Sequence, residues 1–244
     1  MAREKKAVVV GGGLAGLMNT IKLAELGFQI KLFAFSAVKR SHSVCAQGGI
    51  NAAINIKGEG DSPDIHFDDT VYGGDFLANQ PPCKAMAYAA PGIVYLFDRL
   101  GVMFNRTAEG NLDFRRFGGT LYNRTAFAGA TTGQQLIYAL DEQARKWETE
   151  GRVEKYEFWE FLDIVKDSEG VCRGIVAMNM LNHNIEYFKA DAVMIGTGGP
   201  GMIFGRTTNS LANTGSAAGQ LYKSGAYYAN GELVQVHPTA IPGR

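Results

Sequence analysis

The most restrictive feature of this sequence is a cluster of glycines between a strand pattern and a helix pattern. The run Lys6–Val10 has no polar break before the cluster, which is typical of a buried strand in a parallel sheet. The motif Gly11-Gly12-Gly13-Leu14-Ala15-Gly16 follows directly, and apolar residues then recur at helical spacing over 14–26, up to Gly27. Because Gln29–Phe35 reads as a second strand, the segment predicts a βαβ unit.

Each glycine of the GxGxxG pattern has a separate physical task. The first permits a tight turn, the second lets the backbone approach a pyrophosphate, and the third lets helix and strand pack closely. The start of the helix supplies free N–H groups and a favourable dipole for an anion. We therefore predict a Rossmann-like, dinucleotide-binding α/β fold. The residues expected to contact the dinucleotide here are Gly11, Gly13, Leu14, Ala15 and Gly16.

The end of the second predicted strand narrows the choice of dinucleotide. An acidic side chain normally holds the adenosine ribose there, but Leu32–Ser36 contains none. This argues against NAD. Ser36 or backbone groups could hold a ribose instead, which leaves FAD open.

The remaining elements complete the predicted α/β fold. Helices are expected after Ser62-Pro63, from Gln80 to Leu100 with a kink or split at Pro91, and over residues 133–147. Three strands are predicted to form an antiparallel β-meander, and a fourth is predicted to return to the parallel central sheet. The three meander strands are 153–165, 171–179 and 184–188, and the returning strand is 191–196.

Composition limits the kinds of partner. Lysine plus arginine equals aspartate plus glutamate, so there is no basic field to draw nucleic acid, and none is expected as a partner. The three cysteines form no CxxC, so we predict neither a disulfide framework nor a metal site, and Cys45 is expected to be a small buried packing residue. No apolar stretch reaches the roughly 18 to 20 residues of a membrane span, so another subunit would have to supply any anchor.

The segment Arg40–Asn51 reads RSHSVCAQGGIN, and it resembles the flavin loop of succinate dehydrogenase and fumarate reductase flavoprotein subunits of the bacterial type. The resemblance implies FAD bonded covalently to His42 through the C8α methyl of the flavin. Such a bond would withdraw electron density from the ring, as the oxidation of a C–C single bond demands. The cofactor-binding residues implied in this loop are Arg40, Ser41, His42, Ala46, Gln47, Gly48 and Gly49.

Three later segments extend the resemblance. Ile195–Gly199 is similar to a second FAD-contacting strand end, which implies that Thr197, Gly198 and Gly199 bind the cofactor. Ser216 is implied too, although the family often has an acidic residue there. The resemblance also implies two substrate-binding residues, Phe117 in Phe-Gly-Gly and His237 in His-Pro-Thr. Arg115 and Arg116 are interpreted as structural salt-bridge partners.

The resemblance implies interconversion of succinate and fumarate by hydride transfer between the dicarboxylate and covalent FAD. It also implies that electrons pass to an iron–sulfur subunit, a membrane cytochrome b subunit and a quinone, at the cytoplasmic face of the membrane. We interpret residues 1–244 as one FAD-binding domain that is cut before the capping domain. The proton-shuttle arginine is expected beyond residue 244, so no catalytic residue is assigned here, and the chain alone is expected to be inactive.

Three alternatives stay open at this point. L-Aspartate oxidase has a similar glycine pattern but no histidine at the flavin-linking position. A NAD-dependent dehydrogenase would need another way to hold the ribose. The chain could also be a non-catalytic flavin-binding fragment.

Overall fold

Residues 4–205 and 207–235 are described by the computed structural model of the chain, and they fall into two units. Among the described residues, the first unit comprises 4–43, 140–205 and 207–228. The second comprises Val44–Ala139 and Ala229–Gln235. Each unit has its own sheet structure and is described separately below.

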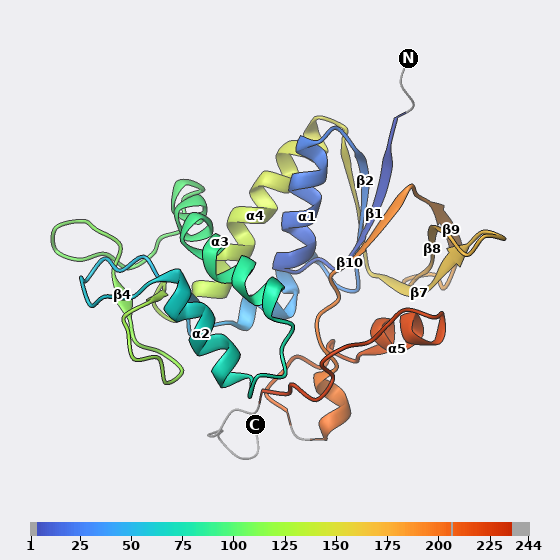
Figure 1. The fold of residues 1–244 in the computed structure, drawn as a ribbon. Coiled ribbons are helices and arrows are strands. Elements are labelled where there is room, and N and C mark those ends of the chain that lie inside the picture. Colours follow the sequence, from blue (N-terminus) through green and yellow to red (C-terminus); the bar gives the residue numbers. More distant parts are fainter. Residues whose placement is uncertain (1–3, 206, 236–244) are drawn as a thin grey trace. The chain divides into compact units, whose positions relative to one another are not determined.

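A parallel sheet of four strands forms the centre of the first unit (Figure 1). Its strand order is β10-β1-β2-β6, and all three neighbouring pairs are parallel. The predicted βαβ unit and the returning strand are both confirmed, as is the mixed α/β class. The strands are β1 (Lys6–Val10), β2 (Gln29–Ala34), β6 (Val153–Glu157) and β10 (Ala192–Ile195).

Helix α1 (Leu14–Glu25) packs on one face of this sheet, beside β1 and β2 (Figure 1). Leu17, Ile21 and Ala24 are buried on one side of the helix, as their spacing predicts. Helix α4 (Thr132–Thr149) begins in the second unit and ends in the first. Its predicted apolar face is also buried, at Leu136, Leu140 and Ala144.

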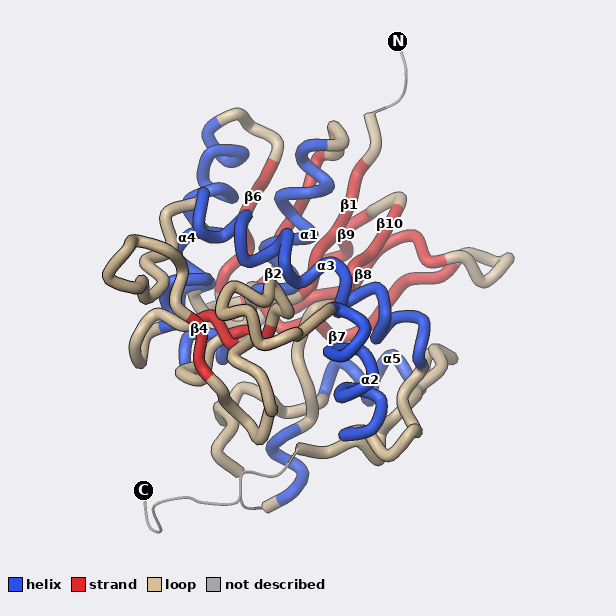
Figure 2. Tube along the Cα trace, turned by 60° about the vertical axis from the view of Figure 1, so that its left-hand side comes forward, coloured by secondary structure: helices blue, strands red, loops and turns tan. Residues whose placement is uncertain are grey.

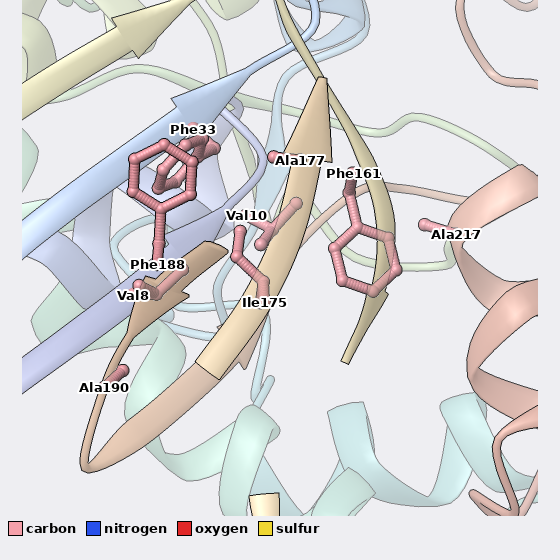
Figure 3. Packing of buried hydrophobic residues seen from close by; sticks show 9 residues of the cluster. All are labelled: Val8, Val10, Phe33, Phe161, Ile175, Ala177, Phe188, Ala190 and Ala217. Atoms are coloured by element: carbon pink, nitrogen blue, oxygen red, sulfur yellow. The ribbon is translucent and has the colours of Figure 1, made fainter. Parts of the chain in front are cut away.

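The antiparallel meander covers the other face of the parallel sheet, and Figure 2 shows its strands beside β1 and β10. It consists of β7 (Trp159–Lys166), β8 (Cys172–Asn179) and β9 (Ile185–Lys189). Between the two sheets the rings of Phe33 and Phe188 lie 4.6 Å apart, edge to face. Figure 3 shows this core, whose buried members are Val8, Val10, Phe33, Phe161, Ile175, Ala177, Phe188, Ala190 and Ala217.

One strand prediction was wrong in this region. Residues 153–165 form two strands rather than one, because Phe158 adopts a left-handed backbone conformation with φ of +62°. A side chain with a Cβ rarely adopts this conformation, and it turns the chain out of the strand direction. As a result the first part of this segment, β6, joins the parallel sheet, and the second part, β7, pairs with β8 in the predicted meander.

The second unit contains two helices and a small antiparallel sheet. Helix α2 (Pro63–Gly73) begins as predicted, because the Ser62 side chain caps it by accepting a hydrogen bond from the Ile65 N–H. Helix α3 (Gln80–Arg99) is continuous through Pro91, so the helix is not split there. The sheet has the order β3-β5-β4, with β3 (Ile50–Asn51), β4 (Phe114–Arg115) and β5 (Thr125–Ala126).

A buried ion pair anchors the middle strand of that small sheet. The Arg124 guanidinium, which is 1% exposed, donates two hydrogen bonds to the Asp61 carboxylate at 2.7 and 3.0 Å and also pairs with Asp69. The Arg124 carbonyl accepts a hydrogen bond from the Ala52 N–H. The ion pair therefore ties β5 to the chain that follows β3.

Short helical segments make up the remaining elements of the first unit. They are η1 (Val38–Arg40), η2 (His42–Cys45), of which His42 and Ser43 fall in this unit, η3 (Gly201–Phe204) and α5 (Ser216–Lys223). Across residues 4–205 and 207–235, no helix combines the length and the apolar character needed to cross a membrane.

Candidate functional site

Three glycines bring the backbone of β1, α1 and β10 into direct contact at the carboxyl edge of the parallel sheet. A Cβ on Gly11 would lie 2.2 Å from the Gly196 carbonyl oxygen, and the φ of Gly11 is +114°. A Cβ on Gly16 would lie 1.7 Å from the Gly11 carbonyl oxygen. Side chains are therefore excluded from this edge, as the glycine motif predicts for a surface that a ligand must approach closely.

The first turn of α1 presents unused hydrogen-bond donors at the same edge. The N–H groups of Ala15 and Gly16 have no acceptor among the described residues. The first turn also contains no acidic side chain. Free N–H groups and an uncompensated helix dipole together form an anion site, which is what a pyrophosphate requires.

His42 is tied to this edge through its neighbour. The Ser43 hydroxyl oxygen lies 3.4 Å from the Leu14 nitrogen and accepts its N–H, at the first residue of α1. The His42 Nδ1 accepts a hydrogen bond from the Ser210 N–H at 3.1 Å. The histidine that sequence reasoning singled out is thus bonded to Ser210 through its ring, and the next residue, Ser43, contacts the start of α1.

Ser41 and Arg40 precede this histidine. The Ser41 hydroxyl is buried and has no hydrogen-bond partner in the described part of the chain. A buried hydroxyl without a partner costs about 1 to 3 kcal/mol, so a ligand that supplied an acceptor or donor would be favoured here. Arg40 is exposed. The residues present therefore fit a bound dinucleotide at the glycine turn, the helix start and Ser41.

A carboxylate from the neighbouring strand β6 lies beside the end of β2, and sequence reasoning missed it. The Ser36 hydroxyl donates to the Ala37 carbonyl at 3.3 Å. The sequence has no acidic side chain at the end of β2, but Glu157 at the end of the neighbouring strand β6 places one there. Its Oε1 accepts the Val38 N–H at 2.8 Å. No local motif marks Glu157, since its place depends on the pairing of two distant segments.

In the second unit, the segment Ala46–Gly49 lies closely against the small sheet; we call this segment the flavin loop. A Cβ on Gly48 would lie 2.5 Å from the Phe117 ring, and a Cβ on Gly49 would lie 2.4 Å from the Ala126 carbonyl oxygen. Gly48, one of the predicted cofactor residues, thus lies against the predicted substrate residue Phe117. Phe117 itself is half exposed.

Two sequence interpretations in this unit need correction. Arg115 forms no salt bridge with any described residue: its Nη2 donates to the carbonyl oxygens of Gly48 at 2.6 Å and Gln47 at 3.3 Å. Arg116 does pair with a carboxylate, that of Glu59, at 3.6 Å. Cys45 is exposed rather than buried, because it lies on the outside of η2.

The second predicted FAD-contacting segment lies just after β10. Gly196 follows the last residue of that strand, Thr197, Gly198 and Gly199 come next, and Gly198 has a φ of +77°. Gly215 caps α5 in a left-handed conformation, and the exposed Ser216 begins that helix with its N–H donating to Thr214 Oγ1 at 3.2 Å. His237 lies outside the described residues.

Comparison with known proteins identifies the family to which this site belongs. Residues 6–244 match the family described as the FAD binding domain. The chain belongs to the FAD binding domain family. The predicted resemblance to succinate dehydrogenase and fumarate reductase flavoprotein subunits is also confirmed. The succinate dehydrogenase flavoprotein subunit of Bacillus subtilis is 69% identical over 240 residues, which cover 98% of this chain and 41% of that protein.

Solved structures agree with this assignment. The Sdh1 complex of Mycobacterium smegmatis with UQ1 contains a chain that matches with a TM-score of 0.86 and 30% identity, over 91% of this chain and 38% of that one. A quinol fumarate reductase of E. coli matches with a TM-score of 0.80 and 31% identity, over 88% of this chain and 36% of that one. The chain thus spans about two fifths of the length of the relatives that it matches.

Proposed function

We propose that this chain is the FAD-carrying part of a flavoprotein that interconverts succinate and fumarate, with the flavin bonded to His42. One observation supports the covalent bond most directly: the Ser210 N–H holds Nδ1 of His42, and the Ser43 hydroxyl ties the same segment to the start of α1. A histidine that is fixed at the edge of a dinucleotide site is well placed to react with the dinucleotide.

The hydrogen bond to Nδ1 also indicates which nitrogen can carry the flavin in the linked product, where the C8α carbon replaces the proton of Nε2, which is lost to solvent. A ring nitrogen that accepts an N–H bond carries its lone pair there, so the neutral ring bears its proton on Nε2. Substitution at Nε2 keeps the bond to Ser210 intact, whereas substitution at Nδ1 would break it. We therefore place the C8α bond at Nε2 of His42.

The proposed contacts to FAD fall into three groups. The donors at the start of α1 hold the pyrophosphate, Ser36 and Glu157 lie at the ribose end, and the flavin loop holds the isoalloxazine. FAD itself supplies the hydride chemistry when it is bound. The complete proposed set is Gly11, Gly13, Leu14, Ala15, Gly16, Ser36, Arg40, Ser41, His42, Ala46, Gln47, Gly48, Gly49, Glu157, Thr197, Gly198, Gly199 and Ser216.

Phe117 and His237 are the proposed substrate-binding residues. The Phe117 ring lies against the backbone of Gly48, so a dicarboxylate that touched this ring would lie next to the flavin loop. His237 would donate a hydrogen bond to a substrate carboxylate. We assign no proton-transferring residue within this chain.

The proposed partners follow from the same assignment. Electrons would leave through an iron–sulfur subunit and a membrane cytochrome b subunit to a quinone, with the protein peripheral on the cytoplasmic face. The described residues offer no cluster of histidine, cysteine and carboxylate side chains that could hold a metal ion.

The test is acid precipitation of the protein expressed from its complete gene. Flavin fluorescence should remain with the polypeptide, and it should be lost from the precipitate of His42→Ser. His42→Ser should still bind FAD noncovalently, and it should lose succinate oxidation more than fumarate reduction, because the substituted flavin is the better oxidant. Equal loss of both activities would contradict the electronic role of the bond.

The same experiment separates the rival functions. Flavin attached to His42 would exclude an enzyme like L-aspartate oxidase, which has no histidine at that position. Flavin that is released by acid from the wild-type protein would favour it. A protein that contains no flavin and binds NAD would overturn the proposal as a whole.

A further inference from the structure

We infer that Arg115 is a positioning residue of the flavin loop. It orients and polarises the loop through the Gln47 and Gly48 carbonyl groups. The inference rests on the proposed function, because it assumes that the loop binds the isoalloxazine of FAD. It goes beyond that function by assigning a role to a residue that touches neither FAD nor the dicarboxylate in the proposed site.

The first three carbonyl groups of the flavin loop accept hydrogen bonds from other residues of the second unit. The Ala46 carbonyl accepts the Gly133 N–H at 2.7 Å. The Gln47 and Gly48 carbonyls both accept from Nη2 of Arg115, at 3.3 and 2.6 Å. Three consecutive peptide groups are thus fixed by one backbone donor and one guanidinium.

The direction of the N–H groups follows from peptide geometry. In a planar trans peptide the N–H points away from the C=O of the same unit. The N–H groups of Gln47, Gly48 and Gly49 therefore point away from the donors that hold the carbonyls. None of the three donates a hydrogen bond to another described residue. They form a row of free donors that a ligand with several acceptor atoms could use.

Arg115 keeps an uncompensated positive charge behind this row. No carboxylate of the described residues pairs with its guanidinium, and its buried Nε has no hydrogen-bond partner among them. Instead the guanidinium lies 4.3 Å from the Phe127 ring centre and 5.3 Å from that of Phe117. The two rings fix its position while leaving its charge unneutralised.

This charge has two consequences for a bound flavin. It polarises the peptides that it contacts, which makes their N–H groups stronger donors. It also favours a ligand that becomes more negative, and reduction of FAD adds negative charge to the ring. Arg115 should therefore tighten FAD binding and raise the reduction potential of the flavin.

The test compares Arg115→Met with Arg116→Met, both in a His42→Ser background so that FAD binding is reversible. Arg116 is the matched control because it carries the same charge at the next position but is 60% exposed and pairs with Glu59 rather than with the loop. FAD dissociation constants and flavin midpoint potentials are measured on the protein from its complete gene. Arg115→Met should bind FAD about tenfold or more weakly, as expected for a lost hydrogen bond to a charged group.

The midpoint potential separates a positioning role from a purely structural one. It should become more negative in Arg115→Met and stay unchanged in Arg116→Met, and Arg115→Lys should recover part of the shift because it restores the charge. If Arg115→Met does not fold, Arg115→Lys and Arg116→Lys are compared instead, and only the former should weaken FAD binding. FAD-loaded variants at positions 115 and 116 that behave alike would overturn this inference alone. Wild-type protein without FAD would overturn the proposed function too.

Discussion

Gly16 shows most directly how a single residue controls the predicted site. Its α-carbon faces the Gly11 carbonyl so closely that a Cβ would lie 1.7 Å from that oxygen, and a backbone atom cannot give way as a flexible side chain can. Gly16→Ala should therefore lower the free energy of unfolding by about 1 to 3 kcal/mol or more and abolish FAD binding. Urea unfolding and FAD titration check these two expectations.

Gly219 provides the control for this substitution. It lies inside α5, and a Cβ there would meet no heavy atom within 4 Å. Gly219→Ala should raise the free energy of unfolding by about 0.5 to 1 kcal/mol, because alanine loses less backbone entropy in a helix. If the two substitutions had equal effects, the close contact at Gly16 would not be what matters.

Ser210 tests the orientation of the predicted flavin-linking histidine. Only its backbone N–H binds His42 Nδ1, so replacement by proline removes the donor whereas replacement by alanine keeps it. Ser210→Pro should reduce the fraction of covalently bound flavin by at least several-fold, and Ser210→Ala should leave it unchanged. Acid-stable flavin fluorescence per mole of protein is the measurement. Equal yields in both variants would show that this hydrogen bond does not orient the imidazole for attachment.

Between elements, Asp141 joins α4 to β6 and η1 in the first unit. Its buried carboxylate lies 2.8 Å from Lys155 Nζ, 3.1 Å from Arg145 Nε and 3.4 Å from Lys39 Nζ. Burial alone would raise the pKa of Asp141, but the hydrogen bond and charge of Lys155, the charge of Arg145 and the hydrogen bond from Lys39 hold that pKa below its usual value. The carboxylate is thus ionised where it holds these elements together.

Asp141→Asn should lower the free energy of unfolding by about 3 kcal/mol near pH 7, because it leaves three cations around a buried neutral group. A depressed pKa means that the stabilisation is complete above the unfolded-state pKa of about 4 and is lost as the pH falls below it. The difference between wild type and variant should therefore shrink below about pH 4. Glu142→Gln is the control, since Glu142 is 62% exposed and lies 3.8 Å from Lys39, and it should change stability by less than about 0.5 kcal/mol. A constant difference across this pH range would contradict the assignment.

The elements that were predictable are those with a local signal. The apolar run of β1, the glycine turn and the periodicity of α1 each lie within one stretch of chain, so the βαβ unit follows from the sequence. The strands β3, β4 and β5 have only two residues each, which is too short for any periodicity, and they exist because distant segments pair. The break at Phe158 was missed for a different reason, because an aromatic residue gives no sign of a left-handed conformation.

At the scale of the whole molecule, the candidate site likewise contains residues that a local sequence signal marks and residues that no local signal marks. The glycines and His42 could be proposed as FAD contacts from the sequence because each lies in a short, recognisable motif. Arg115 and Glu157 were not, because each acts on residues far away in the sequence: Arg115 on the Gln47 and Gly48 carbonyls, and Glu157 on the Val38 N–H. Short motifs thus predict FAD as the ligand, in agreement with the matched family, whereas the contacts that Arg115 and Glu157 make become visible only in the folded structure.

A last prediction concerns whether the 244-residue chain can oxidise succinate by itself. Residues 1–244 span 41% of the Bacillus subtilis relative, and within them we propose substrate contacts only at Phe117 and His237. Two contacts cannot both orient the two carboxylates of succinate and transfer a proton. Because alignment of the reacting groups accounts for much of an enzymatic rate, these two contacts alone should not support turnover. The 244-residue chain should therefore bind FAD but should not reduce an artificial electron acceptor with succinate, whereas the protein from the complete gene should do both. Turnover by the 244-residue chain would mean that a proton-transferring residue lies within it, and Arg40, which is exposed and lies two residues before His42, the proposed flavin-linking histidine, would be the first to replace.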